Sequence, residues 1–565
     1  LYQFRISEEG MYRIDGRFIE DNLPDVNLSD IDPARIRLFN NGGRELPRDI
    51  GAARPQGLVE NAIFVDDGGD GRFDRDDFIL FYGIGVQGWE YDPVTRKFSH
   101  YINHYVRDNI YWLSFDGDQP GKRMEMVTGS PAGPEVRTYQ GLAFVEDELL
   151  NPLKSGLNWF GRQFDLSSRT QTYTLSLPNA LANARAELRF RFIAKTQGLH
   201  RFSISVNDNL LGTRQVNGPF PDFGEFLALR AFPVTLTLDN QLKPGSNQVQ
   251  ILYSHSASFG QALLDWFELL YPAELNAVED ELAFTVLPDS GVKTYRVDGF
   301  SAAPRVFDVT DFAEVKEVTG GSFQGGSLRF AAFQTPSRPA RYIALTSDKF
   351  KTPEAVERVQ FTDLRGPDHG AEYVIITHED FYSDALRLEG LRENLSPKNR
   401  LSTEVVKIDD VYDNFSGGLM DPVAIRDFLK WAYDHWNPRP LYVLLFGDGD
   451  YDYKNLVSKS DKNWIPPFQT DELATSTELR QLVSRATDSW YTYLVGNDRV
   501  MDLAIGRINA QTPEEAKNAV DKVIAYETQP LRGNWRNTIT IVGDDELVTG
   551  GRPSAADNLH IEQAE

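Results

Sequence analysis

The chain has 565 residues, of which 41% are hydrophobic and 25% are charged, a composition that excludes general disorder. This length predicts several domains, since one domain takes roughly 100–200 residues. The 83 Asp and Glu residues outnumber the 58 Lys and Arg residues, so the net charge is −25, which repels nucleic acids and predicts no nucleic-acid partner. No apolar run approaches the ~20 residues of a membrane-spanning helix. The sequence contains no Cys, which excludes disulfides and a cysteine nucleophile within these residues.

Residues 1–133 are predicted to form a β-rich N-terminal domain. Tyr2–Ile6 and Met11–Ile14 alternate apolar and polar residues on either side of Glu8-Glu9-Gly10, a pattern that predicts a hairpin. Aromatic residues are dense here, as on half-buried sheet faces. Two further strands are predicted at Phe78–Tyr82 and Tyr111–Phe115.

Residues 134–275 are predicted to form a β-sandwich, because short strands recur there at roughly 8–12-residue spacing. A last strand is expected to end at Pro272. Residues 276–365 are again strand-like and form either a small β domain or a linker. The predicted sandwich strands are Gln171–Leu177, Ala186–Ala194, His200–Val206, Val234–Leu238, Gln248–Tyr253 and Leu263–Tyr271.

Residues 366–565 change period and alternate strands with helices, which predicts βαβ units around a mostly parallel sheet. Helices are expected from about Leu386 to Ser396, from the Asp421-Pro422 cap, and from the capping box at Thr512–Glu515 to Tyr526. The predicted strands are Tyr373–Ile376, Thr403–Ile408, Tyr442–Phe446 and Thr538–Val542.

An acidic loop between predicted strands is the first candidate site. Aligned with a twelve-residue calcium loop, Asp66, Asp70, Asp74 and Asp77 fall at positions 1, 5, 9 and 12. Position 3 is Gly68, the last ligand is one methylene shorter than Glu, and flanking helices are absent. Calcium is therefore a possible ligand, and the alternative is a solvated acidic turn. No cofactor is otherwise required.

Two more acidic clusters follow strands of the α/β region. Gly447–Tyr453 leaves the carboxyl end of a strand, where open α/β sheets place ligands. Its three aspartates would repel phosphates, so a structural or metal-linked role is favoured over catalysis. Asp544, Asp545 and Glu546 follow another strand and could orient a histidine or bind a metal. The residues alone form no complete catalytic constellation.

The last 200 residues resemble the gingipain-type cysteine peptidases, whose fold is related to that of caspases. An ordered set of short motifs carries the resemblance, and the order is more specific than any one motif. The motifs are Tyr442–Asp448, Thr487–Tyr491, Val495–Asp498, Asp502–Ile508, Ile524–Glu527 and Trp535-Arg536. The β-rich region in front, with Met11–Ile14 and Asp265–Leu269, resembles the subgroup of type IX secretion system sortases.

This resemblance implies a secreted enzyme at the bacterial cell surface, peripheral to the outer membrane. It would remove C-terminal sorting domains from exported cargo and attach the cargo to anionic lipopolysaccharide. An outer-membrane β-barrel partner (PorV-like) would hold it there.

The family's catalytic His and Cys have no counterpart in these 565 residues, so the chain alone is expected to be inactive. By motif order, both residues would follow soon after Glu565, and the remainder of the domain is expected to cover the open sheet edge. The resemblance offers Glu546, Asp545 and Asp544 as supporting acids, with Glu546 favoured. It places Asp557, Asn558 and His560 in the region that shapes the substrate pocket.

Two alternatives to an enzyme remain open. The first is a non-catalytic surface binding or scaffold protein with a dead peptidase-like domain, in which exposed Trp159 or Trp266 binds glycan. Buried tryptophans in a sandwich core are the plainer interpretation. The second alternative is a calcium-stabilised structural module, in which calcium shifts the melting temperature.

Overall fold

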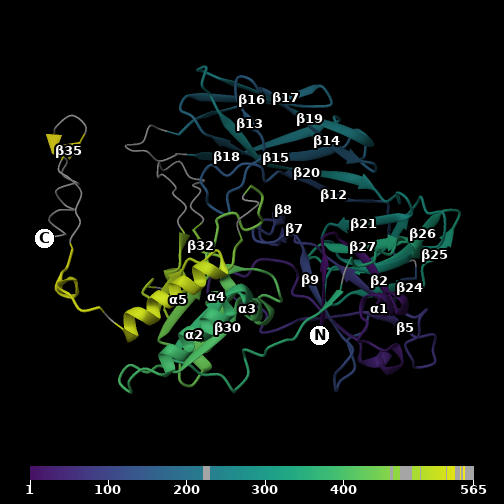
Figure 1. The fold of residues 1–565 in the computed structure, drawn as a ribbon. Helices are drawn as coiled ribbons and strands as arrows, with labels where there is room; N and C mark the ends of the chain where they lie inside the picture. The colour runs from purple at the N-terminus through teal and green to yellow at the C-terminus, as the bar shows by residue number, and fades with distance from the viewer. Residues whose placement is uncertain are drawn as a thin grey trace.

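The computed structural model describes residues 1–130, 132–219, 229–354, 356–457, 462–470, 486–496, 498–529, 531–540, 547–548 and 552–553. A large assembly of β-sheets forms one side of the molecule, and an α/β unit, green to yellow in Figure 1, forms the other. The chain is therefore multidomain and strand-rich with a parallel sheet near its C-terminal end, as the sequence predicted.

The N-terminal region contains two small sheets, one hairpin and one helix. The predicted hairpin between the first two strands is wrong, because β1 pairs with β9 and β28 whereas β2 pairs with β6. The alternating pattern identified the strands but not their partners. The elements are β1 (Tyr2–Ile6), β2 (Gly10–Asp15), α1 (Gly16–Asn22), β3 (Arg37–Phe39), β4 (Glu60–Asn61), β5 (Phe64–Asp66), β6 (Phe78–Gly83), β7 (Gln87–Asp92), β8 (Lys97–Ile102) and β9 (Asn109–Ser114).

The predicted β-sandwich is present. A four-stranded sheet, β14-β19-β16-β17, packs through a common apolar core on the β12-β20-β15-β18 part of a ten-stranded sheet. Alternate residues of β14 and β19 are buried, as a sheet with one core face requires. The strands are β12 (Thr138–Glu146), β13 (Gln163–Phe164), β14 (Thr170–Leu177), β15 (Arg185–Ala194), β16 (Leu199–Val206), β17 (Asn209–Asn217), β18 (Arg230–Asp239), β19 (Gly245–His255) and β20 (Ala262–Glu274).

The small β region is built into the same ten-stranded sheet, whose order is β10-β24-β23-β27-β21-β12-β20-β15-β18 with β13 beside β20. The sheet thus runs through the expected boundaries at residues 133 and 275. A second sheet, β11-β22-β26-β25, packs on it. The strands are β10 (Glu125–Thr128), β11 (Glu135–Val136), β21 (Glu281–Val286), β22 (Gly291–Val297), β23 (Arg305–Asp308), β24 (Lys316–Thr319), β25 (Ser322–Gln324), β26 (Ser327–Gln334), β27 (Ala340–Leu345) and β28 (Val356–Arg358).

The α/β unit is a parallel sheet in the order β30-β29-β31-β34 with helices on both faces. Along β29, Val374 and Ile376 enter the core with α3 and α4, whereas Ile375 packs with α2 and α5. This covering of both faces explains why Val374–Ile376 and Val443–Phe446 are continuous apolar runs. The elements are β29 (Tyr373–Thr377), α2 (Tyr382–Glu393), β30 (Thr403–Lys407), α3 (Ile408–Phe415), α4 (Pro422–His435), β31 (Tyr442–Phe446), β32 (Phe468–Gln469), β33 (Ala486–Thr487), β34 (Ala504–Ile508), α5 (Pro513–Thr528), β35 (Leu547–Val548) and β36 (Arg552–Pro553).

The helix caps confirm the start signals read from the sequence. The Asp421 side chain accepts from the backbone N–H of Val423, and Thr512 accepts from Glu515. The predicted strand at Thr538–Val542 is wrong for its described part, since residues 538–540 are in no strand. Short 3₁₀ helices lie at Leu28–Asp30, Pro33–Arg35, Ser347–Lys349, Glu379–Phe381, Ser489–Thr492 and Asn534–Asn537.

Candidate functional site at the carboxyl edge of the parallel sheet

The four parallel strands end together at one edge of the α/β unit. In open α/β sheets this edge carries the ligand or active site, because loops leave the strands there and helices begin. Here β29 ends at Thr377, β31 at Phe446 and β34 at Ile508. The segments that follow these strands are therefore the candidate site within the described residues.

Arg507, at the end of β34, ties three of these segments together. Its guanidinium donates to both carboxylate oxygens of Asp488, at 2.8 and 2.7 Å. It also donates to the carbonyl oxygens of Gly447 (2.8 Å) and Ile465 (2.7 Å). Burial alone would lower the pKa of Arg507, but the hydrogen bond and charge of Asp488 raise it. Arg507 thus remains a fixed cation that orders the loops at this edge.

Two glycines let the loop after β31 lie directly on residues 464–467. Gly447 has φ of +151°, and a Cβ there would lie 2.8 Å from the Trp464 Cβ. A Cβ at Gly449 would lie 2.4 Å from the Ile465 carbonyl oxygen. Side chains are excluded from both positions, so the glycines serve backbone packing, as the structural interpretation of the motif predicted.

The aspartates of this loop accept hydrogen bonds from the protein itself. Asp448 Oδ2 accepts from Gln511 Nε2 at 2.7 Å. Asp452 is fully buried, and its two oxygens accept from the N–H groups of Leu456 (2.8 Å) and Val457 (2.7 Å). Across the described ranges, no group of three or more His, Cys, Asp or Glu side chains is arranged to hold a metal ion. The tract therefore shapes the edge of the sheet.

The β-sandwich reaches the same edge through the loop around residues 151–160. The ring of Trp159 stacks on Tyr451, with centroids 6.3 Å apart. Gly156, at φ of +72°, lies so close that a Cβ would be 2.6 Å from the Tyr453 ring. Lys454 Nζ pairs with Glu148 Oε2 at 2.5 Å, and its side chain is 5% exposed. The sandwich thus forms one wall beside the candidate site.

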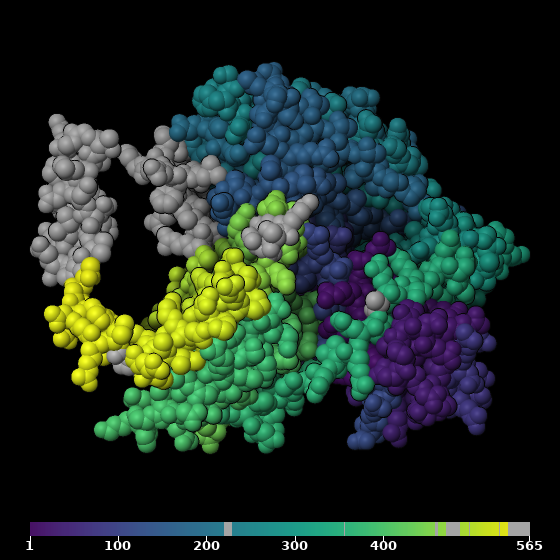
Figure 2. Space-filling model, viewed as in Figure 1, coloured from purple at the N-terminus to yellow at the C-terminus, as the bar shows by residue number. Residues whose placement is uncertain are grey.

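The N-terminal region fastens the β-rich part to the α/β unit through buried polar contacts. Arg54 Nη1 pairs with Asp427 at 2.5 Å, and both side chains are 10% exposed. The N–H of Leu46 donates to Asp421 Oδ2 at 2.8 Å, and Trp112 Nε1 donates to the Gly417 carbonyl at 2.9 Å. The two parts lie in direct contact in Figure 2. These contacts fix the N-terminal region against the α/β unit.

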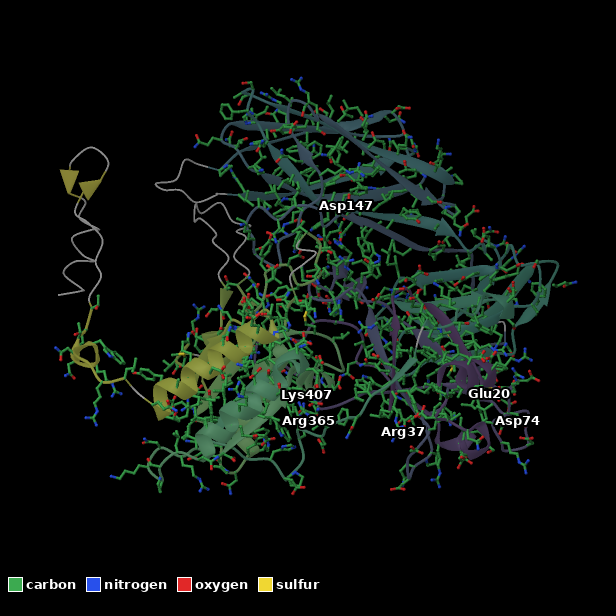
Figure 3. The ribbon with its side chains drawn as sticks, viewed as in Figure 1. Glu20, Arg37, Asp74, Asp147, Arg365 and Lys407 are labelled. Atoms are coloured by element: carbon green, nitrogen blue, oxygen red, sulfur yellow. The ribbon has the colours of Figure 1, made fainter. Side chains whose placement is uncertain are left out.

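The predicted calcium loop lies far from this edge. Figure 3 places Asp74 at the outer rim of the N-terminal region, away from Lys407 of the α/β unit. Its carboxylates accept from nearby N–H groups, for example Asp66 from Gly68 (3.2 Å) and Asp77 from Asp74 (2.6 Å). Among the described residues, no three acidic side chains of this loop are arranged to hold a metal ion. Calcium binding at the loop therefore stays a prediction.

The other residues singled out from the sequence either pack within the β-rich part or lie outside the described residues. The plainer interpretation of buried tryptophans holds for Trp159, which is 3% exposed, whereas Trp266 is half-buried against His100. Two histidines of the N-terminal region are packed against acids: His100 lies between Glu146 and Glu268, and His104 contacts Glu45. The remaining candidates lie outside the described residues: Asp544, Asp545, Glu546, Asp557, Asn558 and His560.

Sequence reasoning missed Arg507 as the residue that organises the site. In the sequence, Arg507 is notable only as part of the Asp502–Ile508 motif. No local pattern marks an arginine that donates hydrogen bonds to three segments distant in the sequence. Its place near the carboxyl end of a parallel strand is the one available clue. Among the described residues, no helix combines the length and hydrophobicity needed to cross a membrane.

The α/β unit resembles a known peptidase family. Residues 366–564 match the model of Peptidase family C25. Gingipain R2 of Porphyromonas gingivalis is 25% identical over 203 residues, which are 35% of this chain and 22% of the relative. Gingipain R1 of the same organism is 24% identical over 200 residues, 35% of this chain and 16% of the relative. The predicted resemblance to gingipain-type peptidases is confirmed.

One solved structure extends the likeness to the β-rich part. The crystal structure of dimeric latent PorU from Porphyromonas gingivalis covers 96% of this chain, with a TM-score of 0.77 and 22% sequence identity. This chain covers 51% of the PorU chain and about a fifth of the gingipains it matches. The overall fold is therefore PorU-like.

Proposed function

Because residues 366–564 carry the features of Peptidase family C25, we propose that the protein containing this chain is a cysteine peptidase. The family match is the observation that carries the proposal. The carboxyl edge of the parallel sheet supports the proposal. The Arg507–Asp488 ion pair fixes the loops there, and Trp159 of the sandwich loop packs on one of them through Tyr451. A peptidase needs such a rigid frame, since small displacements of reacting groups cost large factors in rate.

The finer proposal is a sortase of the type IX secretion system at the bacterial surface, peripheral to the outer membrane. It removes C-terminal sorting domains from exported cargo and joins the cargo to anionic lipopolysaccharide, with a PorV-like β-barrel as partner. The PorU-like fold over 96% of the chain supports this subgroup, since the β-rich part is included in the likeness.

In this proposal the chain supplies the frame, and the reacting groups come from outside it, because the sequence contains no Cys. A thiolate activated by His attacks the scissile carbonyl, and the carbon–nitrogen bond breaks with release of the sorting domain. Backbone N–H groups stabilise the oxyanion. An amine of the acceptor then attacks the thioester, forms the new amide and releases the thiolate.

The test is a transfer assay with the full-length protein, a cargo carrying a C-terminal sorting domain, and an acceptor amine. Mass spectrometry of the cargo distinguishes three products. Amide-linked cargo supports the sortase, hydrolysed cargo supports a peptidase that is not a sortase, and unchanged cargo supports the alternative of a non-catalytic binding or scaffold protein. The Arg507→Lys variant should lose rate, whereas a surface control, Arg17→Ala, should not.

A further inference from the structure

A cavity lies in the β-rich part, away from the parallel sheet. Its volume is about 670 Å³, within the range of small-molecule sites. The β7–β8 hairpin, the middle of β12, the end of β21 and the start of β27 surround it, and these elements neighbour one another in Figure 1. All of its lining residues precede residue 342, so none belongs to the peptidase-like region.

Aromatic side chains dominate the lining and come from separate strands. Trp89 and Tyr91 come from β7, Tyr101 from β8, and Tyr139 and Phe144 from β12. All five are half-buried, so each keeps part of its surface open. Aromatic rings in a core are normally covered, and several partly open rings around one cavity indicate a ligand surface.

Contacts within the protein set the position of three of these rings, those of Tyr101, Trp89 and Phe144. Gly88 lies opposite Tyr101 across the hairpin, and a Cβ there would lie 3.0 Å from the Tyr101 hydroxyl. The guanidinium of Arg44 lies 3.8 Å from the centre of the Tyr101 ring. Trp89 meets Phe144 edge to face at 5.7 Å. The rings are therefore held in place before any ligand binds, which lowers the entropic cost of binding.

Polar side chains with planar end groups also line the cavity. Glu9 is fixed by Arg341 and by the Tyr82 hydroxyl, which donates to Glu9 Oε1 at 2.7 Å. Gln87 and Arg338 are exposed at the rim, and Arg338 forms no ion pair with any residue the structure describes. The cavity thus offers amide and guanidinium groups beside aromatic faces.

We infer that this cavity binds a saccharide chain. A pyranose ring has an apolar face of C–H groups, which are slightly positive and suit the negative face of an aromatic ring. Its edge carries hydroxyls that both donate and accept, and these match glutamine amides, a carboxylate and guanidinium groups. The uncompensated Arg338 favours a sugar that carries an acidic group.

A peptide fits the cavity less well. Extended peptides bind by adding a strand to a sheet edge, whereas the cavity presents side chains from several strands. A proline-rich segment would use the aromatic rings and could accept hydrogen bonds through its carbonyl groups, but proline has no N–H to donate to the Glu9 carboxylate. A polyproline peptide is therefore the competing probe in the test.

The test is calorimetric titration of the full-length protein with maltohexaose, mannohexaose, chitohexaose and hexagalacturonate. At least one saccharide should bind, and Trp89→Ala should weaken it about tenfold, a loss consistent with one aromatic contact. Gln87→Ala and Arg338→Ala should weaken binding without affecting folding, because both side chains are exposed. The matched control is Tyr526→Ala, which removes a 56% exposed ring far along the chain.

Three outcomes would overturn the inference: no saccharide of the panel binds, the cavity variants bind as the wild type does, or only a hexaproline peptide binds. If Trp89→Ala disturbs the hairpin, the two rim variants decide. Alkylation of the protein's thiols should leave saccharide binding unchanged, so a failure of the proposed peptidase activity is distinguished from a failure of this inference.

Discussion

Replacing Arg507 should loosen the whole carboxyl edge of the parallel sheet. The Arg507 side chain is 11% exposed and donates four hydrogen bonds of 2.7–2.8 Å to Asp488, Gly447 and Ile465. Arg507→Ala leaves two carbonyls and a partly buried carboxylate without their donor. Removing one partner of such a pair costs about 3–5 kcal/mol. Asp488 is 26% exposed, so water recovers part of this, and we expect the lower end of the range.

Hydrogen exchange measures this effect locally, which matters because a multidomain chain has no single unfolding free energy. The N–H groups of Gly447 and Asp448 donate to the carbonyls of Ile508 and Ala510, both at 3.0 Å. Their opening free energy should fall by about 3 kcal/mol in Arg507→Ala and by less in Arg507→Lys. In the control Arg17→Ala, whose ion pair is 60% and 82% exposed, it should be unchanged. Equal exchange in Arg507→Ala and the control would refute the reasoning.

Four more outcomes are expected. Arg54→Ala should lower the local opening free energy of α4, measured by hydrogen exchange, by about 3 kcal/mol, because it leaves Asp427 buried without its partner, and an unchanged value would contradict this. Burial and nearby acids raise the pKa of Asp413 to about 8 from 3.8, so stability should fall as pH rises from about 4 to about 8. Asp413→Asn should make the fall of the melting temperature over this pH range shallower, and an unchanged slope would contradict the raised pKa. Burial lowers the pKa of His100, but hydrogen bonds to two glutamates raise it to about 9. An NMR titration should show that midpoint, with the stabilisation lost as pH rises through it, and a midpoint near 6.5 would exclude the buried triad. Calcium bound at the acidic loop should raise the melting temperature of the wild type but not of Asp70→Asn, and identical curves with calcium and chelator would contradict the prediction.

Local patterns predicted most of the elements because they carry their own periodicity. Val374–Ile376 is a continuous apolar run because both faces of its sheet are covered, and Asp421-Pro422 marks a helix start by its cap. Pairing partners were not predictable in this way. The strand Tyr2–Ile6 pairs with Val356–Arg358, and no pattern in the first residues announces a partner so far along the chain.

The site shows the same limit. The sequence indicated a structured loop at Gly447–Tyr453, and the structure confirms its backbone role. A buried Trp159 is the plainer interpretation of the sequence, but a strand pattern cannot reveal that its ring stacks on Tyr451 of the α/β unit. The role of Arg507 likewise depends on three loops that the fold brings together. Contacts between residues far apart in the sequence, such as those of Trp159 and Arg507, can be identified only once the fold is known.

The most direct test of the central claim is the intact denatured mass of the natively produced protein, with and without a thiol-alkylating peptidyl probe. A cysteine peptidase requires a thiol that these 565 residues lack. The account predicts a mass well above 63.9 kDa and the addition of one probe adduct. A mass near 63.9 kDa without an adduct would contradict catalysis and leave a surface binding or scaffold protein.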